Sequence, residues 1–223
     1  MGHRAESNSM SDLKKSFFLK RDLDVLAALD RSVVGIAGAG GLGSNAAAAL
    51  ARAGVGRLII ADFDVLEASD LNRQYYFVDQ IGRPKVEALA ENLRRMNPYS
   101  KYDIRVVRVD PANVASLFGE ADLLIEAFDA ADQKQMLVET WLRLFPERPI
   151  IVGSGLAGFG DNNALRQREL GRLYIIGDES SECDACSAPM APRVAAVAAM
   201  QANLAVEILA REKGLQGEPA CSK

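Results

Sequence analysis

The chain has 223 residues, which is long enough for one large domain. Of these residues 49% are hydrophobic and 25% are charged, a composition that is ordinary for a soluble globular protein. Its net charge of −4 and pI near 5.2 give no reason to expect a nucleic-acid partner, and no uninterrupted apolar run reaches the roughly 18 residues that span a bilayer. Three cysteines are too few for a disulfide framework, and the polar start lacks the apolar core of a signal peptide, so we expect a cytoplasmic protein.

The first 20 residues are polar and charged, and we expect them to be disordered or to dock on the domain through Phe17, Phe18 and Leu19. Leucines at helical spacing predict a short helix over 23–29. The sequence contains no internal repeat and no low-complexity linker. Residues 21–212 are therefore interpreted as a single nucleotide-binding domain and residues 213–223 as a C-terminal tail.

The strongest signal lies between residues 33 and 62. An apolar strand at 33–37 leads into the turn Gly38-Ala39-Gly40-Gly41-Leu42-Gly43, a helix follows, and a second apolar strand at 58–61 ends at Asp62. This order of strand, glycine turn, helix, strand and acid is typical of a nucleotide-binding site. The alternative is a glycine-rich turn in an α/β protein that binds no nucleotide.

Each part of this pattern has a physical role. Gly38 permits the tight turn, Gly40 lets the backbone approach a phosphate, and Gly43 lets the helix pack close to its strand. The helix N-terminus presents unpaired N–H groups and a positive dipole end to an anion. Asp62 stands 19 residues after Gly43, where an acid accepts hydrogen bonds from a ribose hydroxyl. The predicted nucleotide-binding residues of this segment are Gly38, Gly40, Gly41, Gly43 and Asp62.

The rest of the chain alternates predicted strands and helices. Further strands are expected at 106–109, 123–127 and 150–152, and helices at 85–96 (opened by Pro84), 114–118, 132–145 and 192–210. Segment 63–74 is too polar and irregular for a core element. This alternation predicts an α/β fold, a Rossmann-like, mostly parallel sheet with helices on both faces. An antiparallel pair at 165–168 and 173–176 is expected to extend one edge.

Three charged residues stand where phosphates and a metal would lie. Arg73 is in the loop after the second strand, Lys85 is in the first turn of the 85–96 helix, and Asp129 comes just beyond the strand at 123–127. Such sheets bind ligands at the carboxyl ends of their strands. Two cations and one carboxylate suit a triphosphate with Mg²⁺, which Asp129 would hold. The alternatives are solvated surface cations and, for Asp129, a helix N-cap.

Several motifs together resemble the ThiF/MoeB branch of the ubiquitin-activating enzyme superfamily. They are the glycine turn, Asp62-Phe63-Asp64 through Leu71-Asn72-Arg73-Gln74, Gly82-Arg83-Pro84-Lys85, Asp129, and Met190-Ala191-Pro192-Arg193-Val194 with Gln201-Ala202. The resemblance covers residues 23–210, and Asn-Arg-Gln followed by Gly-x-Pro-Lys is its most specific part. The shortness of the chain resembles the compact ThiF subgroup linked with thiamine biosynthesis.

This resemblance implies ATP-dependent adenylation of the C-terminal glycine carboxylate of a ubiquitin-like, ThiS-like sulfur carrier, carried out by a homodimer with Mg²⁺. It also assigns the site by position: Asp62 and Asp64 at the nucleotide, Arg73 and Lys85 at the phosphates, Asp129 at Mg²⁺, and Asn72 and Gln74 as further active-loop positions. A C-terminal carboxylate has a pKa near 3.5, so this nucleophile is already ionised and needs no general base. A chain whose only histidine is His3 can perform such a reaction.

The cysteines depart from the family pattern. Longer relatives hold zinc with two Cys-x-x-Cys pairs, whereas this chain has one pair, Cys183 and Cys186, and a lone Cys221. One pair gives two of the four ligands of a structural zinc, so we expect no zinc unless Cys221 or another protomer contributes. Cys183 or Cys186 could instead take the activated carrier as a thioester or persulfide, or both could be inert thiols. Arg21 is a candidate for the arginine that this family sends into the partner's site, and the alternative is a surface cation.

Two other classes of function fit the same pattern. One is an NAD-dependent oxidoreductase on the same fold, and the other is a non-catalytic module that retains the nucleotide pocket. A small-molecule or tRNA-linked carboxylate is a further alternative to the carrier. We expect Mg-ATP to raise the melting temperature more than NAD does if the adenylation hypothesis is correct.

Overall fold

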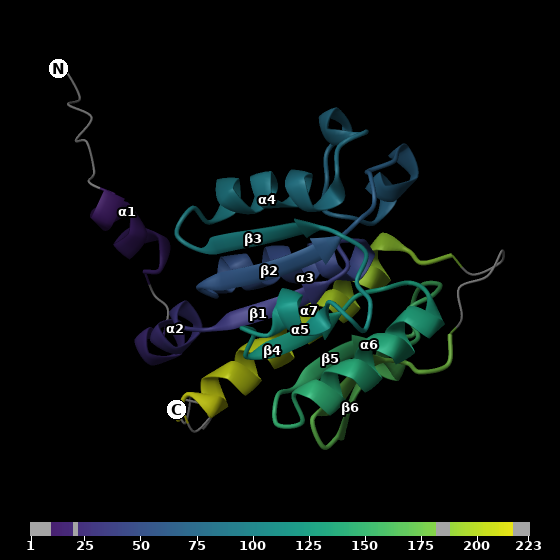
Figure 1. Cartoon of the computed structure of the whole chain (residues 1–223). Helices are drawn as coiled ribbons and strands as arrows, with labels where there is room; N and C mark the ends of the chain where they lie inside the picture. Colours follow the sequence, from purple (N-terminus) through teal and green to yellow (C-terminus); the bar gives the residue numbers. More distant parts are fainter. Residues whose placement is uncertain (1–9, 20–21, 182–187, 216–223) are drawn as a thin grey trace.

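A computed structural model describes residues 10–19, 22–181 and 188–215. In this part of the chain the strands form one seven-stranded sheet in the order β3-β2-β1-β4-β5-β7-β6 (Figure 1). All neighbours are parallel except β6, which runs antiparallel to β7 at the edge. The strands are β1 (Val33–Ala37), β2 (Arg57–Asp62), β3 (Lys101–Val106), β4 (Leu123–Glu126), β5 (Ile150–Gly153), β6 (Arg166–Leu170) and β7 (Leu173–Gly177).

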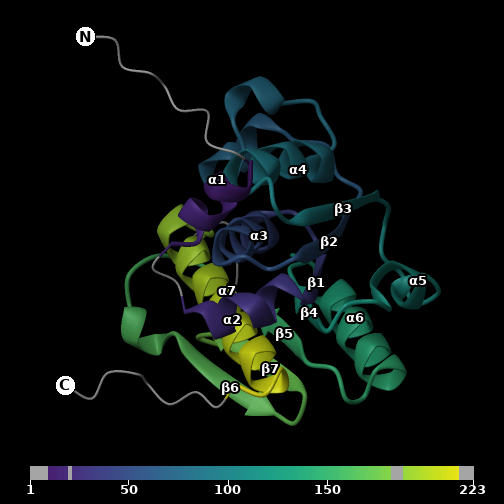
Figure 2. The ribbon, with the colours of Figure 1, turned by 90° about the vertical axis from the view of Figure 1, so that its left-hand side faces the viewer.

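Helices cover both faces of this sheet. Figure 2 shows α3, α4 and α7 on one side of the strands and α5 and α6 on the other. The helices are α1 (Met10–Phe17), α2 (Leu23–Asp30), α3 (Gly41–Ala53), α4 (Lys85–Met96), α5 (Val114–Phe118), α6 (Ala131–Leu144) and α7 (Ala191–Glu212). The predicted fold class, a Rossmann-like sheet with an antiparallel edge extension, is therefore confirmed.

Two apolar clusters fill the space between the sheet and its helices. The larger lies under α3, α4 and α7, where small residues such as Ala46, Ala47, Ala198 and Ala205 are buried between neighbouring helices. The second lies under α5 and α6 around Trp141. Small side chains let α3 approach α7 closely. The apolar groups of the two helices are then packed against each other and removed from water, which stabilises the fold.

Helix α7 bears on the expectation that no apolar run spans a bilayer. Its length and mean composition are sufficient to cross a bilayer, although the sequence has no uninterrupted apolar run of that length. Just over half of its most apolar window is buried inside the protein, against α3 and the sheet. A helix that is buried in a protein core is apolar on most sides, so it can have the same length and composition as a membrane-spanning helix.

The third strand lies earlier than predicted. The prediction of a strand at 106–109 was wrong, because β3 ends at Val106 and pairs residue by residue with β2 from Lys101 onward. The Tyr102 side chain anchors this edge strand, since it is buried and its hydroxyl donates to the Asn97 carbonyl at 2.7 Å. Val109 leaves the sheet and is buried in the cluster under α5 and α6.

The segment 63–74 is better ordered than its polarity indicated. It contains a 3₁₀ helix, η1 (Ala68–Asn72), and Leu66 is only 1% exposed. The Leu66 backbone N–H donates to the Arg83 carbonyl, which ties the segment to the turn before α4. The segment forms no strand or α-helix, as expected, but Leu66 belongs to the core. Two further short 3₁₀ helices are η2 (Val78–Gln80) and η3 (Asn162–Ala164).

The described part of the N-terminal segment packs on the domain through aromatic side chains. Phe18, which follows α1, is buried and lies against Phe17 and Tyr99, with ring centroids 4.8 and 6.3 Å away. A Cβ added to Gly54 at the end of α3 would lie 2.9 Å from the Phe18 ring, so this glycine makes room for the contact. Phe17 and Leu19 remain exposed.

Candidate functional site

A cleft of about 1290 Å³ opens at the carboxyl ends of the central strands. Nine of the residues predicted from the sequence line it: Gly38, Gly40, Gly41, Asp62, Asp64, Arg73, Gln74, Lys85 and Asp129. Two others do not. Gly43 packs inside the first turn of α3, and Asn72 is exposed beside Arg73. The structure therefore brings together residues from the glycine turn, the end of β2, the segment after η1, the start of α4 and the turn after β4.

Steric limits require glycine at two positions of the turn, Gly38 and Gly43. Gly38 has a φ of +101°, which L-residues with a Cβ rarely adopt. A Cβ on Gly43 would lie 1.9 Å from the Gly38 carbonyl oxygen, so the helix could not start at this distance from its strand. Gly40 is different, because the nearest atom to an added Cβ is Gln74 Nε2 at 3.9 Å. The space above Gly40 is therefore open to the cleft.

This contrast predicts separate outcomes for two alanine substitutions. Gly40→Ala is expected to fold with an unchanged melting temperature but to bind ATP at least about tenfold more weakly, since the new methyl group would stand where a phosphate approaches the α3 N-terminus. Gly43→Ala is expected to unfold the protein or lower its melting temperature strongly. Calorimetric titration of ATP checks the first, and wild-type affinity in Gly40→Ala would rule out a phosphate at this turn.

Asp62 closes the glycine turn at the end of β2. Its two carboxylate oxygens accept hydrogen bonds from the backbone N–H groups of Ala39 at 2.6 Å and Asp64 at 2.8 Å. Burial raises the pKa of Asp62, while those two donors and the positive charge of Lys85 act in the opposite direction. Each carboxylate oxygen keeps a second lone pair. Asp62 can thus both shape the turn and accept hydrogen bonds from a ribose.

Lys85 is not a solvated surface cation. Its side chain is only 9% exposed, and its ammonium group lies 3.1 Å from Asp64 Oδ2 and 3.6 Å from Asp70 Oδ2. Asp70 is itself held by Gln74 Nε2 at 2.6 Å and by the Glu67 backbone N–H. These carboxylates hold the Lys85 ammonium group in the cleft wall, so an anionic ligand would meet an already oriented cation.

Arg73 lies on the same rim. Its guanidinium donates to Asn72 Oδ1 at 2.9 Å and to the Ser69 carbonyl at 3.3 Å, and its aliphatic stem passes close to Gly41 at the start of α3. Gln74 Oε1 is buried with no hydrogen-bond partner in the described structure, although it belongs to a cleft-lining side chain. Such an unpaired acceptor is unfavourable unless a ligand supplies a donor.

Asp129 is exposed in the turn between β4 and α6. The N-cap of α6 is Ala130 and no side chain caps it, so the alternative reading of Asp129 as an N-cap was wrong. Within the described residues its carboxylate makes no hydrogen bond or ion pair. Mg²⁺ in nucleotide sites takes one or two carboxylates together with phosphate oxygens and water, and a single accessible carboxylate in the same cleft as the glycine turn, Arg73 and Lys85 fits that donor set.

Other residues that line the cleft, or that donate hydrogen bonds to the glycine turn and Arg73, were missed by the sequence reasoning. Glu126, at the end of β4, is fully buried and paired with Lys134 of α6. Asn45 of α3 donates to the carbonyls of Gly41 and Arg73, and the Tyr76 hydroxyl donates to the Ala39 carbonyl. The detectable signal was Glu126 itself, because it is a charged residue inside an otherwise apolar strand.

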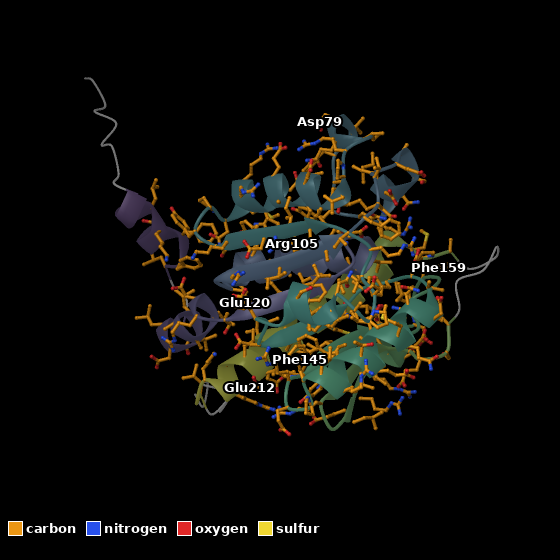
Figure 3. All side chains as sticks on the ribbon, in the orientation of Figure 1. Asp79, Arg105, Glu120, Phe145, Phe159 and Glu212 are labelled. Atoms are coloured by element: carbon orange, nitrogen blue, oxygen red, sulfur yellow. The ribbon has the colours of Figure 1, made fainter. Side chains whose placement is uncertain are left out.

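A second cavity of about 490 Å³ adjoins the cleft and shares Ser181 with it. Figure 3 shows the exposed Phe159, one of its lining residues, at the end of the molecule where α7 begins, with Glu212 at the other end of that helix. Arg193 of α7 pairs with Asp178 at 2.5 Å in its wall, and both side chains are 6% exposed. Burial alone would raise the pKa of Asp178, but hydrogen bonds from Ser181, Ser180 and Arg193 hold it well below its usual range.

This pair predicts a pH-dependent contribution to stability. Because the pKa of Asp178 is lowered by folding, the stabilisation is fully present above its unfolded pKa of about 4 and is lost as the pH falls through the folded value. Asp178→Asn is expected to lower the free energy of unfolding at pH 7 by about 3 kcal/mol, since it leaves Arg193 buried without its charge partner. Urea unfolding at pH 7 and pH 3 measures this.

The difference between wild type and Asp178→Asn should shrink at pH 3, and an equal difference at both pH values would contradict the assignment. Glu120→Gln serves as the control, because Glu120 forms an exposed pair with Arg57 and its loss should change stability little.

Some predicted residues lie outside the described part of the chain. They are His3, Arg21, Cys183, Cys186 and Cys221. Within the described residues, no group of three or more His, Cys, Asp or Glu side chains is arranged to hold a metal ion. The three hypotheses for Cys183 and Cys186, namely sulfur transfer, zinc binding and inert thiols, therefore stay open.

Comparison with known proteins adds independent information. Residues 15–221 match the model of the ThiF family. The chain is 41% identical over 109 residues to the molybdopterin-synthase adenylyltransferase of Escherichia coli (strain K12), covering 48% of this chain and 44% of the relative. It is 34% identical over 140 residues to the adenylyltransferase and sulfurtransferase UBA4 of Eremothecium gossypii, covering 62% and 31%. The match thus spans less than half the length of these curated relatives.

Among solved structures, the fold matches E. coli tRNA N6-threonylcarbamoyladenosine dehydratase, TcdA. Its complex with AMP superposes with a TM-score of 0.82 at 20% identity, covering 93% of this chain and 98% of that chain. Its complex with ATP gives a TM-score of 0.82 at 21% identity, with coverage of 94% and 99%. At this level of identity the likeness establishes a common fold.

Proposed function

The chain belongs to the ThiF family, and from this premise we propose that it is an adenylyltransferase that activates the C-terminal glycine carboxylate of a ubiquitin-like sulfur carrier with ATP. The observation that carries the proposal is one cleft lined by an open glycine turn, two cations, Arg73 and Lys85, and an exposed carboxylate, Asp129. A hydride-transfer enzyme has no need of the cations and carboxylate at this rim, whereas a triphosphate does.

The proposed reaction asks little acid–base chemistry of the protein. A carboxylate oxygen of the substrate bonds to the α-phosphorus of ATP, the bond from that phosphorus to the bridging oxygen breaks, and pyrophosphate leaves with the electron pair. The α3 N-terminus at Gly40 would bind phosphate, and Arg73 and Lys85 would neutralise the leaving pyrophosphate. Bound Mg²⁺, held by Asp129, would withdraw charge from the phosphate oxygens. The catalytic contribution is then positioning and charge stabilisation.

The first candidate carrier is a ThiS-like protein of thiamine biosynthesis, on the basis of the compact ThiF pattern of the sequence. ATP–pyrophosphate exchange with a panel of purified carriers that end in glycine tests this choice, and the named functions of the relatives suggest molybdopterin-synthase, UBA4-type and SAMP carriers for the panel. Exchange that requires one carrier and its terminal glycine supports the proposal. ATP binding without exchange for any substrate would favour a non-catalytic module.

A second candidate substrate is a carboxylate carried on tRNA. The likeness to TcdA supports it, because that fold matches nearly the whole length of both chains. The net charge of −4 argues against it, since tRNA binding relies on basic surface. Including threonylcarbamoyl-tRNA in the panel separates the two substrates. A larger thermal shift with NAD than with Mg-ATP would instead favour an oxidoreductase.

We predict that Asp62→Ala weakens ATP binding by about tenfold or more while turnover at saturating ATP stays within a few-fold of wild type. Ribose contacts are made equally in the ground state and the transition state, so their loss raises KM rather than lowering kcat. Asp62→Asn is the control, because its amide oxygen can still accept one of the N–H groups of Ala39 and Asp64. A lower kcat with unchanged ATP affinity would contradict the ribose assignment.

Three further parts of the proposal concern the whole protein. We propose a homodimer, which sedimentation tests, and a cytoplasmic location. We also expect adenylation to survive replacement of both Cys183 and Cys186 by serine, because the phosphate-handling residues all come from other segments. Loss of metal and stability in that double variant would favour zinc instead.

A further inference from the structure

The ion pair between Glu126 and Lys134 lies in the wall of the cleft, beside the turn that carries Asp129. Glu126 is 0% exposed at the end of β4, next to the apolar residues of that strand. Burial raises the pKa of Glu126, while Lys134 and the backbone N–H groups of Phe128 and Gly153 act in the opposite direction. A buried carboxylate is unfavourable unless such donors surround it.

The donors to Glu126 come from both sides of Asp129 in the sequence. Phe128, directly before Asp129, donates its backbone N–H to Glu126 Oε1 at 2.6 Å. Lys134, in the second turn of α6, donates its ammonium group to both carboxylate oxygens, at 3.0 and 2.9 Å. The Glu126 carboxylate therefore ties together the two ends of the turn from β4 to α6. Asp129 lies between Phe128 and Lys134, the two residues that donate to it.

Asp129 itself is left accessible by this arrangement. Its side chain makes no hydrogen bond or ion pair within the described residues, although the segments on either side of it are fixed. Lys134 keeps a quarter of its side chain exposed and lines the same cleft. A structural role alone does not require charge, because a well-packed apolar pair is commonly as stabilising as a buried ion pair.

We propose that Glu126 and Lys134 are positioning residues that hold Asp129 at the place where the nucleotide-bound Mg²⁺ binds. This inference rests on the proposed function in one respect, since it takes Asp129 as the residue that binds the metal. The groups that support a metal ligand commonly change metal affinity tenfold to a hundredfold when they are removed. The expected effect of breaking the pair is therefore on metal affinity rather than on nucleotide affinity.

The test titrates Mg²⁺ into the full chain with a fluorescent ATP analogue already bound and with no carboxylate substrate present. Lys134→Met is expected to raise the half-saturating Mg²⁺ concentration by about tenfold or more, and affinity for the analogue in EDTA should stay within about threefold of wild type. Lys134→Arg keeps a charged donor to Glu126 and is expected to restore most of the Mg²⁺ affinity. Lys213→Met is the matched control, since Lys213 pairs with Asp122 at the opposite end of β4.

Wild-type Mg²⁺ dependence in a folded Lys134→Met variant would overturn the inference, as would Mg²⁺-independent nucleotide binding by the wild-type protein. If Lys134→Met does not fold, Lys134→Gln takes its place, because glutamine can still donate to Glu126 without a charge, and the same shift is expected. Failure of every carrier and of threonylcarbamoyl-tRNA in the exchange assay would refute the proposed substrates. That result would leave the Mg²⁺ titration unaffected, because the titration contains no carboxylate substrate. Failure of the proposed substrates can therefore be distinguished from failure of the inference about Glu126 and Lys134.

Discussion

Replacing Asp129 by alanine is expected to abolish substrate-dependent ATP–pyrophosphate exchange while the melting temperature stays at the wild-type value. Asp129 is exposed, does not cap α6, and has no side-chain partner among the described residues, so folding does not depend on it. A carboxylate that holds the metal on the phosphates acts where charge develops in the transition state. We expect a loss of about a thousandfold, or roughly 4 kcal/mol.

The control for this variant lies close by in the sequence. Asp132→Ala removes an exposed carboxylate from the first turn of α6, three residues further along, that does not line the cleft. Exchange by Asp132→Ala should remain close to wild type. Near-normal exchange by Asp129→Ala would show that the reaction proceeds without this carboxylate, and would therefore remove Asp129 from the metal-binding role.

Arg73→Ala and Lys85→Ala are each expected to slow adenylation by about a hundredfold or more, on the order of 3 kcal/mol of transition-state stabilisation. Both cations line the cleft beside the glycine turn, where negative charge would build up in the proposed reaction as pyrophosphate leaves. The interaction strengthens during the reaction, so kcat should fall more than ATP affinity does. Single-turnover formation of the acyl-adenylate measures this step directly.

Lys85→Ala has a second consequence that must be separated from catalysis. It leaves the buried Asp70 without its nearby cation, so the melting temperature is expected to fall as well. Arg83→Ala is the control for both variants, because Arg83 lies two residues before Lys85 and forms an exposed pair with Glu91 at 2.7 Å. If Arg73→Ala or Lys85→Ala raised only KM for ATP, these cations would bind the nucleotide without stabilising the transition state.

The sequence predicted the parts of this protein that depend on local rules. The glycine turn, its helix and the acid at Asp62 follow from steric limits and hydrogen-bonding needs within about 30 residues of chain. The resemblance placed Arg73, Lys85 and Asp129 at one site, and the structure brings them to one cleft because parallel strands end at the same edge of a sheet. Alternation of strands and helices was sufficient for the fold class.

Tertiary packing decided what no local rule contains. The third strand begins at Lys101 because Tyr102 finds a buried position against β2 and α4, whereas residues 107–109, which follow the end of the strand at Val106, leave the sheet. The pairs Glu126–Lys134 and Asp178–Arg193 depend on helices that dock beside strand ends, so the sequence shows Glu126 as an unusual charge in an apolar strand but does not show which residue pairs with it. Sequence periodicity reports which side of an element is buried. Which charged groups meet there depends on how the elements pack, and that is decided only when the core forms.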